Sequence, residues 1–383
     1  MGDVPETALH RISAISETKI IRDLPFSQLT TLRLGGAPAA TVRCGSLDAV
    51  VAVVRELDSR RVPALIVGGG SNLVVADDPG DLVAVVIDAD RVEVRAEGDG
   101  FLVEAEAGAE WDRVVAQAVA AGAGGVECLS GIPGSAGATP VQNVGAYGVE
   151  ISSVLAEALL LDRATGEVAW TPPAALELGY RSSNLKHTAR AVVLAVRLRL
   201  TGDGLSAPLR YGELARRLGV AADEAAAGRA RRPVAEVRRE VLALRRGKGM
   251  VLDPADHDTW SAGSFFTNPV IDAAALGEVR AAVAARCGAE AAAAMPAHPA
   301  RAGRVKLSAA WLIERAGFGR GYPGEGAPVR LSTKHTLALT NRGAARTADL
   351  VALAREVRDG VAAAFGVRLH PEPVWVGVAI DGD

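Results

Sequence analysis

Two glycine-rich stretches decide the fold of this chain: ALIVGGGSN at residues 64–72 and SGIPGSAGATPVQNVGAYG at residues 130–148. The first stretch reads as a buried strand, Ala64–Val67, that runs into three glycines. Glycines allow positive φ angles and let the backbone N–H groups turn outward, which suits a diphosphate. An ordinary tight turn explains GGGSN equally well. The segment is not a GxGxxG fingerprint, because no long helix opens at its third glycine.

The second stretch favours a nucleotide site over a simple turn. A long glycine-rich loop inside a compact domain is usually functional. This one carries few charges but keeps Gln142, Asn143 and Tyr147. Neutral amides fit hydrogen bonding to an isoalloxazine or ribityl group better than charge pairing does. The two stretches together therefore predict a bound flavin nucleotide.

Length and composition exclude several other classes of protein. With 383 residues, 49% hydrophobic and 23% charged, the chain is globular and long enough for two or three domains. A net charge of −3 gives no support for binding to nucleic acid or to a membrane surface. Three distant cysteines and six scattered histidines form no disulfide framework and no metal site. Because residues 1–23 lack an apolar signal core and no later run is long enough to span a bilayer, we expect a cytoplasmic protein.

The pattern along the chain alternates helices and strands. Ser46 is a plausible N-cap for a helix over Leu47–Arg60, and Thr347–Phe365 carries an apolar stripe at helical spacing. Further helices are expected at Trp111–Ala121, Pro233–Arg246, Ala273–Ala285 and Leu307–Ala316, and strands at Leu82–Ile87, Arg91–Ala96, Phe101–Ala107, Val154–Asp162, Glu167–Trp170, Ala191–Leu200 and Val374–Ile380. We expect the C-terminal strand to return to the first domain.

Five motifs, in addition to the two glycine stretches, identify a family. They are TLRLGG at 31–36, GYRSSNLK at 179–186, RYGEL at 210–214, GSFFTNP at 263–269 and HPEP at 370–373. In this order the chain resembles the UDP-N-acetylenolpyruvoylglucosamine reductase (MurB) family from about Leu29 to Gly377. Tyr211 resembles the tyrosine on a mobile loop that marks the type I subtype of that family. The stretch Gly249–Ala262 is longer than the linker usual in that subtype.

The resemblance implies an α+β fold of three domains. Two of them form an FAD-binding unit of the vanillyl-alcohol-oxidase (PCMH) type, and the third is an α/β domain that binds substrate. The implied bounds are 1–89 together with 367–383, then 90–246, then 247–366. The glycine turns alone are shared with the wider FAD class, so the family rests on the later motifs.

The implied activity is the NADPH-dependent reduction of UDP-N-acetylglucosamine enolpyruvate to UDP-N-acetylmuramate in peptidoglycan synthesis. Hydride goes from flavin N5 to C3 of the enolpyruvyl group and a proton goes to C2. Arg181 would bind the substrate carboxylate, Ser264 would protonate C2, and Glu372 would orient Arg181 or share a proton. Without the resemblance these side chains would be interpreted as a surface ion pair, a turn residue and an exposed acid.

The resemblance also assigns the binding residues. FAD, held non-covalently, would contact Gly68, Gly69, Gly70, Ser71, Asn72, Gly131, Ile132, Pro133, Gly134, Gly137, Ala138, Gln142, Asn143, Gly145 and Tyr147. The UDP-sugar would contact Tyr180, Tyr211, Arg245, Lys248, Asn268 and His335. Tyr211 would close over the diphosphate, although packing on the next helix also explains it. No metal, nucleic acid or membrane partner is implied, and we expect a monomer.

Two other functions are compatible with the glycine stretches. An oxidase or dehydrogenase of the wider FAD class would explain the glycines but not Ser264 or Tyr211. A non-catalytic flavin-binding module would give no reason for Arg181, Ser264 and Glu372 to occur together. These alternatives differ in whether bound flavin turns over and with which substrate.

Overall fold

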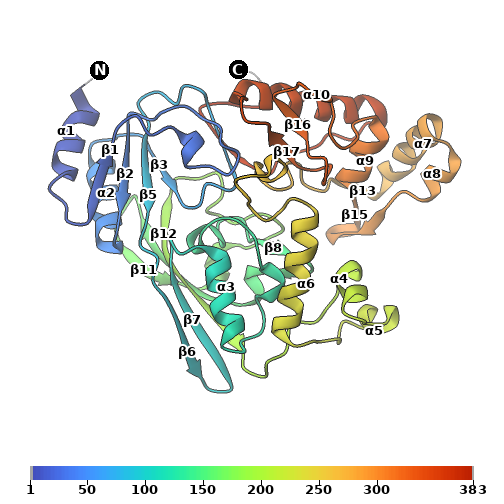
Figure 1. Ribbon diagram of the computed structural model, residues 1–383, viewed down its shortest axis with the longest axis horizontal. Helices are drawn as coiled ribbons and strands as arrows, with labels where there is room; N and C mark the ends of the chain where they lie inside the picture. The colour runs from blue at the N-terminus through green and yellow to red at the C-terminus, as the bar shows by residue number, and fades with distance from the viewer. Residues whose placement is uncertain (1–2, 382–383) are drawn as a thin grey trace. The chain divides into compact units, whose positions relative to one another are not determined.

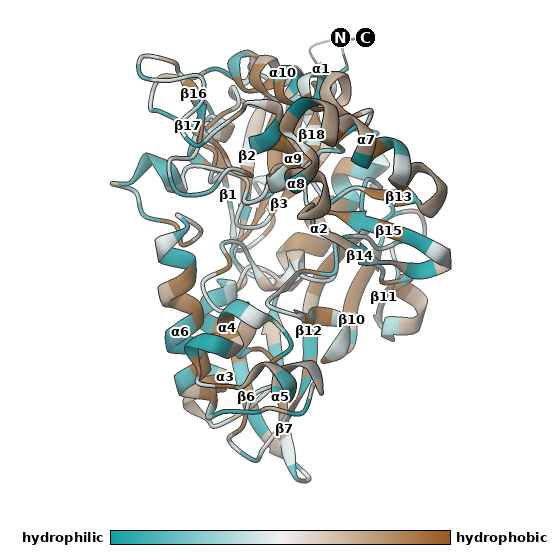
Figure 2. Ribbon diagram, turned by 90° about the vertical axis from the view of Figure 1, so that its right-hand side faces the viewer, coloured by the Kyte–Doolittle hydropathy of each residue, from teal (hydrophilic) through white to brown (hydrophobic). Residues whose placement is uncertain are grey.

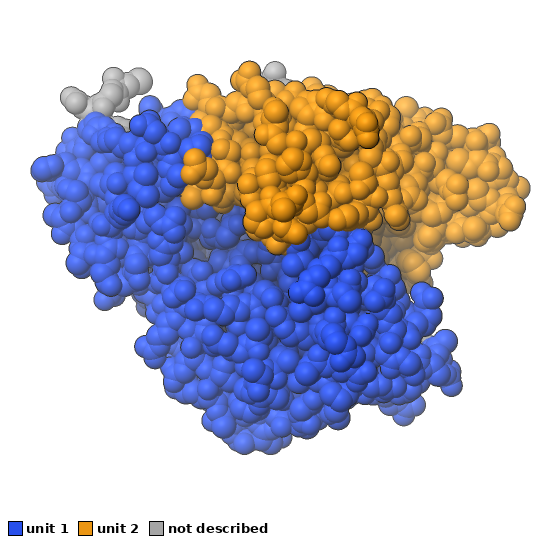
Figure 3. All heavy atoms as spheres, in the orientation of Figure 1, with its two compact units in different colours: residues 1–25, 37–70, 80–251 blue, residues 26–36, 71–79, 252–383 orange. Residues whose placement is uncertain are grey.

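The computed structural model describes residues 3–381, and its contacts divide the chain into two compact units (Figures 1 and 3). The first unit comprises residues 1–25, 37–70 and 80–251, and the second comprises 26–36, 71–79 and 252–383. Both units mix helices and strands, which confirms the predicted α+β class. The three predicted domains are a functional division, and their bounds stay a prediction.

The first sheet of the first unit has four strands. Their order is β1 (Thr18–Ile21), β2 (Ala40–Cys44), β5 (Val83–Ile87) and β3 (Ala64–Val67). Strands β2, β5 and β3 are parallel, so the chain must cross over between them, and helix α2 (Leu47–Ser59) makes the first crossing. The predicted cap is confirmed, because Ser46 accepts a hydrogen bond from the amide of Ala49 at 3.3 Å. Helix α1 (Asp3–Ile12) packs beside α2.

The second sheet of this unit is antiparallel. Its order is β11 (Val168–Thr171), β10 (Leu155–Asp162), β12 (Ala191–Thr201), β7 (Gly100–Glu106) and β6 (Val92–Glu97). Helices α3 (Trp111–Ala120) and α6 (Val234–Gly247) share a hydrophobic core with it. The turns of α6 alternate between hydrophobic and hydrophilic residues, as expected for a helix with one buried face (Figure 2). The remaining elements are β8 (Gly145–Ala146), β9 (Val149–Glu150), α4 (Gly212–Arg217) and α5 (Ala222–Ala226).

The second unit is built around one long helix, α10 (Thr347–Phe365), whose predicted bounds are confirmed. Its stripe of Leu350, Leu353, Val357, Val361 and Phe365 is buried in the core of the unit. Around it lie β13 (Val270–Asp272), α7 (Leu276–Cys287), α8 (Ala289–Ala293), β14 (Ala297–Pro299), β15 (Arg304–Leu307), α9 (Ala309–Ala316), β16 (Val329–Leu331) and β17 (Leu339–Asn341). Strands β13, β15 and β14 form a sheet in that order, and β16 pairs with β17.

Two early segments of the chain belong to this second unit. Strand β4 (Leu73–Val75) pairs in parallel with β18 (Val374–Val376), so the C-terminal strand does return to residues near the start of the chain. The side-chain amide of Asn341 donates to the carbonyls of Leu32 and Arg33 at 3.0 and 3.1 Å. These long-range contacts fix the TLRLGG motif within the second unit.

Three predicted elements were wrong at their ends. The helix predicted from Leu307 begins at Ala309, because Leu307 ends β15 and Ser308 caps the helix by accepting from the amide of Trp311. The helix predicted from Ala273 begins at Leu276 after a turn of 3-10 helix. The strand predicted over Val374–Ile380 stops at Val376, because Gly377 takes a φ of +67° that ends the extended backbone.

We predict that Asp77→Ala destabilises the start of α10. The carboxylate of Asp77 accepts from the amides of Thr347 and Ala348 at 2.8 and 3.2 Å, where a helix has unpaired donors. Loss of such a cap costs about 1–2 kcal/mol. Amide hydrogen exchange of α10 should therefore accelerate, whereas Asp272→Ala, which removes an exposed acid that caps nothing, should leave it unchanged. Equal exchange in both variants would contradict the role of Asp77.

Candidate functional site

The two glycine stretches meet within the first unit. A Cβ on Gly69 would lie 2.5 Å from the Cα of Gly134, and a Cβ on Gly68 would lie 2.2 Å from Ser135 Oγ. Real Cβ atoms do not approach a backbone so closely, because the distance lies well inside van der Waals contact. Gly70 has a φ of +59°, which residues with side chains rarely adopt. The glycines are therefore required by the approach of one backbone to another.

An ion pair anchors the second stretch between two helices. The amide of Gly131 donates to Asp112 Oδ1 at 2.6 Å, and the guanidinium of Arg238 donates to both oxygens of Asp112 at 2.6 and 2.8 Å. Burial alone raises the pKa of Asp112, but the hydrogen bonds from Arg238 and Gly131 outweigh it and hold the pKa below its usual value. Asp112 therefore stays ionised and holds the loop to α3 and α6.

Arg181 docks onto the same stretch. It lies in the tight turn 179–182 with a φ of +53°. Its guanidinium donates to the carbonyl of Gly145 at 2.5 Å and to that of Asn143 at 3.4 Å, while Glu150 lies 4.0 Å away. Asn143 in turn donates to the carbonyl of Gly179 at 2.9 Å. The structure thus brings together the predicted residues Arg181, Asn143 and Gly145, and Tyr180 beside them is 46% exposed.

A second group of predicted residues gathers near Tyr147. The rings of Tyr147 and Tyr211 meet edge to face, with centroids 5.3 Å apart. Lys248 Nζ lies 2.6 Å from Glu213 Oε2, which follows Tyr211 at the start of α4. Arg245 donates to the carbonyl of Met250 at 2.7 Å. The predicted residues Tyr211, Arg245 and Lys248 therefore belong to the same unit as the second glycine stretch.

Burial changes the acid strength of this group. Burial raises the pKa of Tyr147 to about 12. The charge of Arg245 lowers this pKa, whereas Tyr211 and Glu213 raise it further. Burial also lowers the pKa of Arg245, since it penalises the charged form. An anion placed close to Arg245 would restore the stability of its charge.

The second unit holds Ser264, Glu372 and His335 together. The amide of Glu372 donates to the carbonyl of Phe265 at 2.9 Å, so the chain segments of Ser264 and Glu372 run side by side. Ser264 Oγ lies 3.4 Å from His335 Nε2. Asn72 is tied to the same segment, because the amide of Val374 donates to its carbonyl at 2.9 Å. The spacing of these residues in the sequence does not indicate that their segments are in contact.

Asn268 has a structural contact of its own. Its side-chain oxygen accepts a hydrogen bond from the amide of Ala309 at 3.0 Å, at the first residue of α9. This bond satisfies one of the unpaired donors of the helix. The side-chain oxygen of Asn268 is thus engaged in placing α9.

Glu213 and the pair of Asp112 with Arg238 were not predicted from the sequence. Glu213 stands in the quoted RYGEL motif, but its partner Lys248 is 35 residues away. Asp112 and Arg238 are 126 residues apart. A charged residue in a helix is usually solvated, so no local signal distinguishes these pairs from surface charges.

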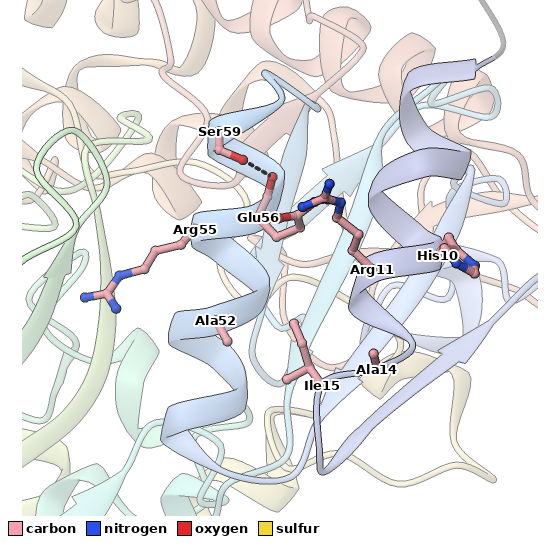
Figure 4. A pocket seen from close by; sticks show the side chains of 8 residues that line it. All are labelled: His10, Arg11, Ala14, Ile15, Ala52, Arg55, Glu56 and Ser59. Carbon is pink, nitrogen blue, oxygen red and sulfur yellow. Dashed lines mark hydrogen bonds and ion pairs between the residues drawn. The ribbon is translucent and has the colours of Figure 1, made fainter.

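A surface groove elsewhere in the first unit has a different character. It has a volume of about 740 Å³ and is lined by α1, the turn after α1 and α2, through His10, Arg11, Ala14, Ile15, Ala52, Arg55, Glu56 and Ser59 (Figure 4). None of the predicted site residues lines it. In Figure 4 the side chain of Arg55 points away from α1, and Arg11 faces Glu56 at 3.9 Å. The groove therefore adds nothing to the candidate site.

Two kinds of feature are absent from residues 3–381. These residues contain no group of three or more His, Cys, Asp or Glu side chains arranged to hold a metal ion. Within the same range, every helix is too short or too polar to cross a membrane.

Comparison with known proteins gives consistent matches. A family model described as "FAD binding domain" matches residues 38–172, and one described as "UDP-N-acetylenolpyruvoylglucosamine reductase, C-terminal domain" matches residues 253–376. The chain is 58% identical over 370 residues to UDP-N-acetylenolpyruvoylglucosamine reductase 2 of Corynebacterium glutamicum, covering 97% of this chain and 98% of that protein. It is 62% identical over 355 residues to the reductase of Nocardia farcinica, covering 93% and 89%.

A solved structure agrees in fold. The crystal structure of UDP-N-acetylenolpyruvylglucosamine reductase from Thermus caldophilus superposes with a TM-score of 0.60. The match covers 94% of this chain and 99% of that chain at 21% sequence identity.

We predict that Gly69→Ala weakens the binding of FAD. The new Cβ would overlap the backbone of Gly134 and push the two glycine stretches apart, at a cost of about 1–3 kcal/mol. The free protein can relax this overlap by moving the stretches apart, whereas bound FAD holds them together. The cost therefore falls on binding and corresponds to at least a roughly fivefold rise in the dissociation constant, measured by adding FAD to protein stripped of cofactor. Gly277→Ala is the matched control, because its Cβ would meet nothing within 4 Å. An unchanged constant for Gly69→Ala would mean that this contact does not shape the FAD site.

Proposed function

The chain belongs to the UDP-N-acetylenolpyruvoylglucosamine reductase family, and on that premise we propose which of its residues carry the reaction. It is an FAD-dependent oxidoreductase that uses NADPH to reduce UDP-N-acetylglucosamine enolpyruvate to UDP-N-acetylmuramate in peptidoglycan synthesis. The observation that carries this function is the identity of 58% over 97% of the chain to a reductase of the same name.

The glycine stretches have the shape that FAD needs. Gly68, Gly69 and Gly137 stand where any Cβ would collide with neighbouring atoms, so the backbone itself lines the cradle. When bound, FAD would supply the hydride chemistry that links NADPH to C3 of the enolpyruvyl group. We propose that the stretches 68–72 and 131–147 hold it without a covalent bond.

Arg181 is proposed to bind the carboxylate of the substrate. Its guanidinium has five donors, of which two are directed at the carbonyls of Asn143 and Gly145. These bonds fix the plane of the group, and the carboxylate of Glu150 lies 4.0 Å from it. A fixed cation stabilises negative charge as it develops at C2 and spreads into the carboxylate.

Ser264 is proposed to donate the proton to C2. A serine hydroxyl is a weak acid, but an enolate-like carbon is a strong base, so the transfer is feasible. Glu372 lies on the paired segment, with its amide held at 2.9 Å by the carbonyl of Phe265 and its position stiffened by Pro371 and Pro373. We propose that this carboxylate orients Arg181 or shares a proton as charge develops.

The group around Tyr147 is proposed to bind the diphosphate. Lys248 is already paired with Glu213 at 2.6 Å, so the diphosphate must replace a carboxylate on that lysine. Glu213 follows Tyr211, so breaking the pair would release the segment that carries Tyr211. This supports the closing role of Tyr211 and the type I subtype. Tyr180, Asn268 and His335 complete the proposed sugar contacts.

Three further features are part of the proposal. The proposed domains are residues 1–89 with 367–383 and residues 90–246, which together form the FAD-binding unit, and residues 247–366, the substrate-binding domain. The protein acts as a monomer in the cytoplasm. A net charge of −3 is in keeping with the absence of nucleic-acid partners.

The first test is optical. We predict that the purified protein is yellow and oxidises NADPH faster when UDP-N-acetylglucosamine enolpyruvate is added, as followed by NADPH absorbance. A colourless protein that fails to take up FAD would contradict the flavin site. A yellow protein that is indifferent to the enolpyruvyl substrate would favour a non-catalytic flavin module or an oxidase of the wider FAD class.

The second test separates the two half-reactions. We predict that Ser264→Ala leaves reduction of bound FAD by NADPH unchanged but slows reoxidation by the enolpyruvyl substrate by a factor on the order of 10³, because only the second step needs the proton. Both rates are measured by stopped-flow absorbance of the flavin. Ser59→Ala, an exposed serine on α2, is the control. Equal losses in both half-reactions would assign Ser264 a structural role.

A further inference from the structure

The loop that joins β16 to β17 carries His335 up to Ser264. This loop, residues 332–338, is closed by two backbone hydrogen bonds: from the amide of Ser332 to the carbonyl of Ala338 at 2.8 Å, and from the amide of Ala338 to the carbonyl of His335 at 3.0 Å. The amide of Phe265 donates to the carbonyl of Leu337 at 2.7 Å, which fixes the serine segment against the loop. The contact between Ser264 and His335 is therefore built into the backbone.

A buried hydroxyl orients the histidine. Ser332 is fully buried, and its Oγ accepts from the amides of Lys334 and His335 at 3.0 and 3.2 Å. A hydroxyl that accepts two amides still has its own proton to donate. Ser332 also acts as a donor that lowers the pKa of the Asp258 carboxylate. Ser332 thus stabilises the loop from inside its own sequence, and Asp258 stabilises it from another segment of the chain.

Asp258 accepts hydrogen bonds that hold this loop in place. It is 4% exposed, and its oxygens accept from the amide and hydroxyl of Thr333 at 2.9 and 2.5 Å and from Arg342 at 3.1 Å. Burial raises the pKa of Asp258, but the bonds from Thr333, Ser332 and Arg342 hold it below its usual value. The carboxylate is thus charged and fully engaged.

Asp258 comes from the stretch Gly249–Ala262, whose extra length has no role in the proposed reaction so far. The amide of Asp258 donates to Asp256 Oδ1 at 3.0 Å, and the amide of Asn341 donates to the carbonyl of Trp260 at 3.1 Å. The stretch is therefore hydrogen-bonded to β17, and it places Asp258 in contact with the loop of residues 332–338.

We propose that His335, held in place by Asp258 through Ser332 and Thr333, positions the hydroxyl of Ser264 for proton donation. This inference rests on the proposed role of Ser264. Nε2–H of His335 donates to Ser264 Oγ, because a serine that donated to the imidazole would have committed the proton that C2 needs. With Oγ acting as the acceptor, its O–H bond is directed away from the imidazole.

The proton transfer then balances as follows. The O–H bond of Ser264 breaks, and the electron pair at C2 takes the proton to form the C2–H bond. Oγ is left as an alkoxide, which accepts the Nε2–H bond and later regains a proton from water. The distance of 3.4 Å is long for a neutral pair and should shorten as Oγ becomes negative, since bonds to an ionised acceptor are shorter and about twice as strong. His335 is a positioning residue in this scheme.

The test compares His335→Ala with His335→Gln. We expect His335→Ala to slow flavin reoxidation at saturating substrate by about ten- to hundredfold, as the loss of a hydrogen bond to a charged group predicts. Reduction by NADPH should stay unchanged. His335→Gln keeps an N–H donor at similar reach and should restore the rate to within about threefold of wild type. His298→Ala, an exposed histidine of β14, is the matched control.

Substrate affinity separates positioning from binding. If His335 only binds the sugar, His335→Ala will raise the dissociation constant of the enolpyruvyl substrate and leave the rate at saturating substrate unchanged. That result would overturn the inference. If Ser264→Ala itself leaves reoxidation fast, the proposed function of Ser264 fails first and the positioning role fails with it. If Ser264→Ala is slow but His335→Ala is fast, only the present inference fails.

Asp258 is tested through its dependence on His335. Asp258→Asn should slow reoxidation in the same direction, and the double variant with His335→Ala should be no slower than His335→Ala alone, because both act through one contact. Thr333→Val removes only one of the bonds and serves if Asp258→Asn does not fold. Asp272→Asn is the exposed control. Multiplicative losses in the double variant would show that Asp258 does not act through His335.

Discussion

The approach of Gly69 to Gly134 is the constraint on which the first unit depends. Any Cβ on Gly69 would lie 2.5 Å from the Cα of Gly134, so no side chain is tolerated and β3 and the loop after α3 must meet through bare backbone. Bare backbone presents N–H groups, and a surface of N–H groups without side chains suits an anionic nucleotide. The same constraint explains why the loop must be anchored elsewhere, by Asp112 and Arg238.

The GGGSN turn has a second consequence, because it stands where the chain passes from one unit to the other. Gly70 ends a segment of the first unit and Ser71 begins a segment of the second. Immediately afterwards β4 pairs with β18, and the carbonyl of Asn72 accepts from the amide of Val374. Val374 follows the HPEP motif, so the strand that leaves the glycine turn is paired with the strand that follows Glu372. Along the chain, a single turn thus connects the glycines proposed to hold FAD to a strand that pairs beside Glu372, a residue proposed for catalysis.

Local structure could be predicted from the sequence, whereas the contacts between distant segments could not. The N-cap at Ser46 and the whole of α10 follow from a capping residue and from apolar spacing, which act within a few residues. The start of α9 was missed by two residues, because Leu307 also fits the apolar pattern and only the pairing of β15 assigns it to a strand. Ser264, His335 and Glu372 are brought together by backbone pairings between distant segments, which composition and period do not encode. Their grouping could be anticipated only from a family resemblance. Glu213 stands in one of the quoted motifs, but its pairing with Lys248 had no signal in the sequence, and Asp258 had none at all.

The cations of the candidate site differ in what holds them, and the difference matches their proposed tasks. The guanidinium of Arg181 is oriented by the carbonyls of Gly145 and Asn143, with Glu150 at 4.0 Å, so its plane is fixed before substrate binds. Lys248 is held by the carboxylate of Glu213, which cancels its charge until a stronger anion replaces it. A cation that must act in the transition state gains from being preorganised, because no reorganisation is then required as the charge develops. A cation that only binds a diphosphate can exchange one anionic partner for another. For Lys248 that exchange would also break its ion pair with Glu213, which holds the segment of Tyr211. The fixed orientation of Arg181 and the exchangeable partner of Lys248 thus distinguish the residue proposed for catalysis from the residue proposed for recognition.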